Sequence, residues 1–286
     1  MTIPLSHAKY SFIAMPENVT TILFLLIVFM ISVPNIANAV TPWFEDGFEW
    51  NDVLDAKTNG PWSLYEGNVS ISNTYAHSGN ASIKICYGNN EAQSFIAFDS
   101  PGLIKGTNNG QTHIYLRWWE LRGPNYDWSG EKFNRVMGLK SNDNVTLDYP
   151  LGWVADGGWG QSGTNDAGSI QMFGNSTYSN GLTHWKYTYK MPREEWHVFE
   201  YELKLNDVGT PNGVSRLWID DHLVAEAANV EYRYANYTLD RVWIGGWYSG
   251  GVNPDPSPAC RYVDDVAAST EKMGLAPPKP PTVNAP

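Results

Sequence analysis

The stretch HIYLRWWELRG, residues 113 to 123, alternates between two kinds of side chain. Ile114, Leu116 and Trp118 would lie on one face of an extended chain, because successive side chains of a β-strand point to opposite sides of the sheet. The other face would carry His113, Tyr115, Arg117 and Trp119. The first face is typical of a packed core, whereas the second is unusual for a surface that only has to be soluble. The stretch therefore predicts a β-strand with one core face and one candidate binding face.

Strand signals recur along the rest of the chain as short runs rich in β-branched and aromatic residues between Gly, Pro, Asn or Asp. Such runs occupy residues 81–88, 94–100, 194–206, 214–219, 240–247 and 261–269. The chain also contains 26 Gly and 18 Pro, as expected for many turns and few long helices. We find no convincing amphipathic helix. Many strands at this spacing predict an all-β fold, either a sandwich or a barrel.

The N-terminal part of the chain has the features of an export signal. An almost unbroken apolar run from Ile22 to Val33 has the length of the hydrophobic part of a signal peptide, and Ala37-Asn38-Ala39 matches a cleavage signature. We therefore expect residues 1–39 to be a signal peptide and the mature protein to be secreted. The alternative is an uncleaved segment that anchors the protein at the outer cell surface, although the run is short for a span of ~20 residues.

The remainder of the chain contains no linker and no internal repeat, so we expect one domain over residues 42–270. Residues 271–286 end in APPKPPTVNAP, and we expect them to form a Pro-rich, mobile tail.

The formal net charge of −11 makes nucleic acid an unfavourable partner. We expect a monomer that does not contact a membrane after signal cleavage. Basic residues are nevertheless concentrated between residues 117 and 140. This segment could serve an anionic ligand, or it could be a solvated face with ion pairs such as Glu120 with Arg122.

Two cysteines are present, Cys86 and Cys260. In an exported protein they could form a disulfide, and two buried thiols are the equal alternative. Asn-x-Ser/Thr acceptors, which fit the surface of an extracellular glycoprotein, occur at Asn68, Asn80, Asn144, Asn175 and Asn236.

Other predicted strands repeat the contrast between an aliphatic face and a face of aromatic and basic groups. Val242 and Ile244 oppose Arg241, Trp243 and Trp247. The same holds for residues 214–220, and residues 184–190 place three aromatic rings on one face. If these faces belong to one sheet, they form an aromatic surface with cationic groups. Such a surface suits a polysaccharide, because rings stack on sugar C–H faces and cations bind carboxylates. The alternative is that the rings fill a wide core.

Three segments of the chain resemble known protein families. FEDGFEW (44–50) resembles the opening of many jelly-roll carbohydrate modules. Two longer segments resemble secreted polysaccharide lyases of the concanavalin A-like superfamily, namely IYLRWWELRGPNYDWSGEKFNRVMGL (114–139) and EEWHVFEYELKLNDVGTPNGVSRLWIDDHLV (194–224). The likeness is to the alginate and glucuronan lyase type, with heparin lyase more distant, and it covers most of residues 42–270. It implies a β-jelly-roll sandwich of two curved antiparallel sheets.

The resemblance also implies β-elimination on a uronate-containing polysaccharide. A cation neutralises the carboxylate, a base removes the neighbouring proton, and an acid protonates the leaving oxygen. Arg117 and Arg135 are then candidates to bind the carboxylate, and Lys132 could be the base or the neutralising group. The remaining catalytic candidates are Tyr187 and Tyr189, as an acid/base pair, and His113, as a second base. The candidates for substrate binding are Tyr115, Trp119, Arg241, Trp243 and Trp247.

In related sandwiches an early carboxylate and a carboxylate of the last strand share a structural calcium ion. The resemblance therefore implies a Ca²⁺ site of Glu45 or Asp46 with Asp264 or Asp265, and no organic cofactor. Two other functions use the same fold, a non-catalytic lectin-like module and a cell-surface adhesion protein. Only the enzyme requires a proton-transfer residue in addition to stacking rings.

Overall fold

The computed structural model describes residues 40–62, 64–87, 93–99, 111–126, 131–138, 154–155, 167–172, 187–190, 192–231, 241–248 and 259–275. The predicted signal peptide and the end of the predicted tail lie outside these ranges. The described residues belong to one compact unit that starts at Val40. They include no helix that is long and apolar enough to span a membrane.

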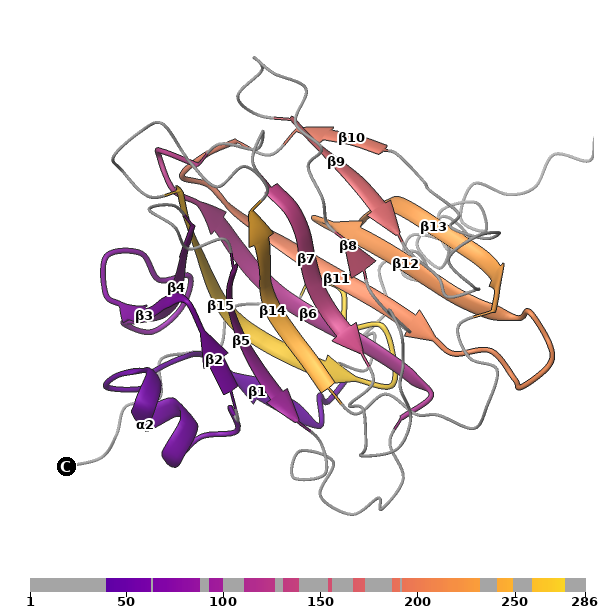
Figure 1. The fold of residues 1–286 in the computed structure, drawn as a ribbon, viewed down its shortest axis with the longest axis horizontal. Coiled ribbons are helices and arrows are strands. Elements are labelled where there is room, and N and C mark those ends of the chain that lie inside the picture. Colours follow the sequence, from indigo (N-terminus) through magenta and orange to yellow (C-terminus); the bar gives the residue numbers. More distant parts are fainter. Residues whose placement is uncertain are drawn as a thin grey trace, which may run out of the picture. The chain divides into compact units, whose positions relative to one another are not determined.

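The larger part of the fold is an antiparallel eight-stranded sheet with the order β13-β12-β11-β6-β15-β4-β3, in which β1 also pairs with β15 (Figure 1). Its strands are β1 (Phe44–Asp46), β3 (Asn68–Ser72), β4 (Ser82–Tyr87), β6 (His113–Arg122), β11 (Trp196–Lys204), β12 (Gly213–Ile219), β13 (His222–Val230) and β15 (Ala259–Ser269).

Two smaller sheets complete the fold. The four-stranded sheet has the order β2-β5-β14-β7, and the three-stranded sheet has the order β10-β9-β8. Their strands are β2 (Leu64–Glu66), β5 (Gln93–Asp99), β7 (Glu131–Gly138), β8 (Val154–Ala155), β9 (Ala167–Met172), β10 (Tyr187–Lys190) and β14 (Arg241–Tyr248). One short helix, α2 (Val53–Thr58), is not predicted by the sequence pattern. It begins where the Asp52 side chain accepts a hydrogen bond from the Asp55 amide at 2.7 Å.

The larger of two hydrophobic clusters among the described residues joins the eight-stranded and four-stranded sheets. Ile114, Leu116 and Trp118 of β6 belong to the same buried cluster as Ile96 of β5 and Ile244 of β14. The two sheets also overlap in Figure 1, with β14 and β7 drawn in front of β6 and β15. The all-β sandwich is therefore confirmed, and the alternation in β6 assigned its core face correctly. We call the opposite side of the larger sheet, away from this core, its outer face.

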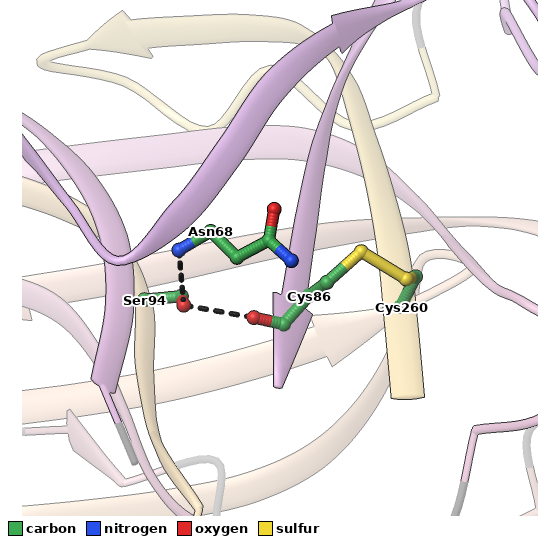
Figure 2. The surroundings of a disulfide bond; sticks show 4 residues. All are labelled: Asn68, Cys86, Ser94 and Cys260. Atoms are coloured by element: carbon green, nitrogen blue, oxygen red, sulfur yellow. Dashed lines mark hydrogen bonds between the residues drawn. A yellow bond between two sulfur atoms is a disulfide. The ribbon is translucent and has the colours of Figure 1, made fainter. Parts of the chain in front are cut away.

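Cys86 and Cys260 form a disulfide in the structure. They are directly opposite one another on β4 and β15, and they pack with Leu121 and Tyr262 away from the main core. Ser94 of β5 lies beside this link (Figure 2). Its hydroxyl accepts from the Asn68 amide at 3.0 Å and donates to the Cys86 carbonyl at 2.8 Å. Strand β4 is thus linked to β15 by the disulfide and to β5 of the smaller sheet by the Ser94 hydroxyl.

Replacing both cysteines by serine should lower the free energy of unfolding by about 2–5 kcal/mol, because the disulfide closes a long loop and restricts the unfolded chain. The sequence separation is 174 residues. Urea unfolding of the double variant tests this expectation, and reduced wild-type protein is the matched control. Equal urea midpoints for the oxidised wild type and the variant would contradict it.

Candidate functional site

The predicted binding strands do not belong to one sheet. β6, with His113, Tyr115, Arg117 and Trp119, is central in the eight-stranded sheet, whereas β7 and β14 pair in the four-stranded sheet and β10 lies in the three-stranded sheet. The single aromatic and cationic surface considered from the sequence is therefore divided between separate sheets. The reason is that alternation assigns the two faces of a strand but does not identify the sheet that the strand joins.

The backbones of β7 and β14 bring several candidates onto neighbouring strands. Arg135 is paired with Gly245, and Trp247 is paired with Phe133, next to Lys132. On β10, Tyr187 is paired with Ile170 of β9. The candidate side chains on these strands lie outside the described part of the structure. They are Lys132, Arg135, Tyr187, Tyr189, Arg241, Trp243 and Trp247.

The candidates on β6 lie on the outer face, and the chain itself supplies partners for them. His113 Nε2 is 2.8 Å from Glu202 Oε1, and the Arg117 guanidinium donates to the Gly274 carbonyl at 3.3 Å. Trp119 stacks on the imidazole of His77, with ring centroids 3.7 Å apart. Burial raises the pKa of the Tyr115 hydroxyl, and its hydrogen bond to Glu202 raises the pKa further. These groups are already engaged within the domain, so they are poorly placed to begin proton transfer on a substrate.

The C-terminal segment crosses the outer face beside Arg117. The Glu200 carboxylate accepts hydrogen bonds from the Met273 amide at 2.5 Å and from the Gly274 amide at 2.9 Å. Burial raises the pKa of Glu200 even though these two amides stabilise its charge. Lys272 pairs with Asp221. Residues 271–275, at the start of the predicted tail, are thus attached to the sheet by the hydrogen bonds from Met273 and Gly274.

A charged cluster lies buried inside the sandwich, where the sequence had suggested a solvated ion pair as one alternative. Glu120 and Arg122, considered from the sequence as a solvated pair, are both fully buried, and their side chains are 2.6 Å apart. Arg261 of β15 lies 3.5 Å from the same carboxylate. Burial alone would raise the pKa of Glu120, but the two guanidinium groups and the Trp118 indole outweigh it and lower the pKa.

This cluster fixes the start of the connection from β6 to β7. The Arg122 guanidinium lies 4.4 Å from the ring centre of the buried Tyr126. The Tyr126 amide donates to the Gly123 carbonyl at 3.0 Å, and the Gly123 amide donates to the Cys260 carbonyl at 2.9 Å. The buried charges therefore stabilise the turn from which the chain continues to the strand of Lys132 and Arg135. The sequence does contain a signal for this burial. Glu120 and Arg122 have even numbers, like Ile114, Leu116 and Trp118, so alternation places both charges on the core side of β6.

The predicted calcium ligands have other contacts. Asp46 accepts hydrogen bonds from the Phe48 amide at 2.7 Å and from the indoles of Trp50 and Trp62 at 3.1 and 2.6 Å. Glu45 precedes it on β1. Within the described residues no group of three or more His, Cys, Asp or Glu side chains could hold a metal ion.

Asp264 and Asp265 lie together, but their four oxygens bind the chain. Asp264 accepts from the amides of His77, Ser78 and Asp265, and Asp265 contacts the His77 ring and the Ser78 hydroxyl. Burial and the neighbouring Asp265 carboxylate raise the pKa of Asp264 to about 8. All four carboxylate oxygens of this pair thus contact the chain itself, and the calcium ion stays a prediction.

Comparison with protein-family models and with curated protein sequences gives no match. Among solved structures, the chain is similar to an endo-beta-1,4-glucuronan lyase from the fungus Trichoderma reesei, with 12% identity and a TM-score of 0.55 over 81% of this chain and 96% of that chain. It is also similar to a marine alginate lyase from Aplysia kurodai, with 14% identity and a TM-score of 0.58 over 81% of this chain and 100% of that chain.

A third similar structure is a variant of the alginate lyase Aly36B, in which a lysine and a tyrosine are replaced by alanine, in complex with an alginate tetrasaccharide. Its identity is 12% and its TM-score 0.52 over 82% of this chain and 98% of that chain. At these identities the similarity establishes the fold alone, so the predicted jelly-roll sandwich is confirmed.

Replacing Glu120 by glutamine should lower the free energy of unfolding at neutral pH by about 3–5 kcal/mol, because two buried guanidinium groups lose their shared carboxylate. Since the folded-state pKa of Glu120 is lowered, its contribution is present above the unfolded pKa and is lost as pH falls through the folded pKa. The difference between wild type and variant should therefore shrink at acid pH. Urea unfolding measured from neutral to acid pH tests both expectations.

Glu226→Gln is the matched control for this experiment. The Glu226 side chain is 42% exposed, so its ion pair with Arg216 should contribute less than about 1 kcal/mol to the free energy of unfolding. Equal losses in the two variants would contradict a special role of the buried cluster.

Proposed function

We propose that this chain is a polysaccharide lyase that cleaves a uronate-containing polysaccharide by β-elimination. The observation that carries the proposal is the fold similarity to one glucuronan lyase and two alginate lyase structures, which extends over at least 96% of each of those chains. The resemblance of residues 114–139 and 194–224 to the same type of enzyme supports it independently, because it depends on the sequence alone.

In this proposal the reaction takes place at the strands β7, β10 and β14. The candidates on β6 are bound to acceptors within the domain, so the proton-transfer groups are better sought on the other two sheets. Arg135 would bind the substrate carboxylate, which makes the neighbouring C–H bond more acidic. Lys132 would remove that proton, and Tyr187 or Tyr189 would donate a proton to the glycosidic oxygen as its bond to carbon breaks.

The Aly36B variant supports the choice of residue types. In its complex with alginate tetrasaccharide, alanine replaces one lysine and one tyrosine. We infer that Lys132 and one tyrosine of the pair on β10 have corresponding roles here. Glu131 directly precedes Lys132 in the sequence, where the motif of the lyases that this chain resembles has glycine, so a negative charge is adjacent in sequence to the proposed base.

The alternative function is a non-catalytic carbohydrate-binding module. The observation in its favour is the outer face, where aromatic rings are combined with paired charges rather than with free proton-transfer groups. An adhesion protein is less well supported, because the large exposed hydrophobic side chains within the described residues are Leu54, Tyr65, Val208, Leu223 and Leu275, which lie on separate elements or connecting segments.

The decisive assay follows the ultraviolet absorbance of the unsaturated uronate product during incubation with alginate, glucuronan, pectate or heparin, with and without calcium. Lys132→Ala should lower the rate by a factor of about 100 or more, as expected for loss of a general base. One of the two variants Tyr187→Phe and Tyr189→Phe should cause a similar loss, because it removes the acid. His113→Ala should retain the rate, because His113 lies on the outer face. Absence of product on every polymer would contradict the proposed lyase activity. Loss of activity only in His113→Ala would place the active site on β6 instead.

The proposal includes export, for which the apolar run Ile22–Val33 and the sequence Ala37-Asn38-Ala39 are the support. We expect the mature chain to begin at Val40, and glycans at some of the Asn-x-Ser/Thr acceptors where the host attaches them. N-terminal sequencing of protein collected from the medium tests the cleavage site. An intact N-terminus on a cell-bound protein would instead support the anchored alternative.

A further inference from the structure

Three aromatic side chains form a row across β6 and β12 on the outer face of the eight-stranded sheet. The ring centroids of His113 and Tyr115 are 5.1 Å apart, and those of Tyr115 and Trp218 are 6.3 Å apart with an angle of 30° between the planes. All three side chains are partly exposed. We call His113, Tyr115 and Trp218 the outer aromatic row.

Polar groups that can read hydroxyls surround this row. Glu202 contacts His113 at 2.8 Å and Arg216 at 2.9 Å, and Arg216 also binds Glu226 at 2.7 Å. The Arg216 and Glu226 side chains are 34% and 42% exposed, so part of their hydrogen-bonding capacity faces solvent. Flat rings flanked by carboxylate and guanidinium groups are the combination that binds sugars, because the rings cover C–H faces and the polar groups bind hydroxyls.

The charges around the row balance. Four cations, Arg117, Lys204, Arg216 and Lys272, lie on this face with four anions, Glu200, Glu202, Asp221 and Glu226, which gives a local charge of zero when His113 is neutral. Such a surface has no excess of cations for a polyanion, so charge complementarity favours an uncharged ligand. A site that binds uronate carboxylates needs an excess of positive charge, and the outer aromatic row lacks one.

The row is also held in place before any ligand arrives. The His113 ring is fixed by Glu202, and the Lys272 ammonium group lies 4.9 Å from the ring centre of Trp218 while it pairs with Asp221. The backbone of the Lys272 segment is attached through Glu200. Preorganised rings lose little conformational entropy on binding, which favours affinity.

We propose that the outer aromatic row is a second carbohydrate-binding surface, which takes a neutral polysaccharide such as a glucan and is separate from the proposed uronate-cleaving site. Trp218 and Tyr115 would stack on successive sugar rings, and Arg216, Glu202 and Glu226 would bind their hydroxyls. The Lys272 ammonium group would move off Trp218 as a sugar takes its place. The inference does not depend on lyase activity, because it rests on the outer face alone.

The test is affinity electrophoresis of the full chain in gels that contain hydroxyethyl cellulose, a soluble neutral glucan, with alginate gels for comparison. The wild type should be retarded by the neutral glucan, and Trp218→Ala should weaken its affinity by about tenfold, equivalent to about 1.4 kcal/mol of stacking energy. Tyr65→Ala is the matched control. Tyr65 is another exposed ring with a lysine above it, Lys57 at 5.8 Å, but it lies on β2 of the other sheet.

A second variant keeps the test informative if Trp218→Ala unfolds. Lys272→Ala should increase retardation several-fold, because a sugar can then stack on Trp218 without first displacing the lysine ammonium group. If Trp218 has only a structural role, the variant should show no increase. Uronate cleavage, if present in the wild type, should be unchanged in the variants. The proposal is overturned if the wild type is not retarded by the neutral glucan, if Tyr65→Ala loses as much affinity as Trp218→Ala, or if Lys272→Ala leaves retardation unchanged.

Discussion

The strand β6 is the constraint on which the rest of the structure depends. It pairs with β11 on one side and β15 on the other, so both halves of the eight-stranded sheet are built on it. Its even-numbered side chains enter the core, where Trp118 stacks on Phe199 with centroids 5.2 Å apart. Because the period of a strand is two, the same placement directs every odd-numbered side chain of β6 to the outer face. One packing requirement therefore determines the chemistry of both faces.

The charged residues follow from the same alternation. Glu120 and Arg122 occupy core positions of β6, where an isolated charge would be costly, and the sandwich accepts them because Arg261 of the neighbouring strand shares the carboxylate. On the outer face the acids Glu200 and Glu202 of β11 lie opposite Arg117 and Tyr115 of β6. On this face Arg117 and Arg216 thus lie beside carboxylates, which compensates their positive charge.

The sequence predicted the fold class and the two faces of β6 because both depend on local patterns. It could not assign strands to sheets, since pairing such as that of β14 with β5 and β7 joins segments more than 100 residues apart. For this reason Arg117 and Arg135 are equivalent candidates in the sequence although they lie on different sheets. The attachment of Met273 and Gly274 was equally hidden, because it uses backbone amides, which carry no sequence signal.

The division between sheets has a consequence for function. A polymer that lies on β7 and β14 is separated from the outer aromatic row by the hydrophobic core that joins the two sheets. If both proposals hold, the two surfaces would bind different polysaccharide chains at once, without competing for the same side chains. A protein with this arrangement could remain attached to a neutral polysaccharide through Trp218 while a uronate chain is cleaved and released on the other side. Attachment would raise the local concentration of the second polymer wherever the two occur together, with no new contact to the reacting sugar.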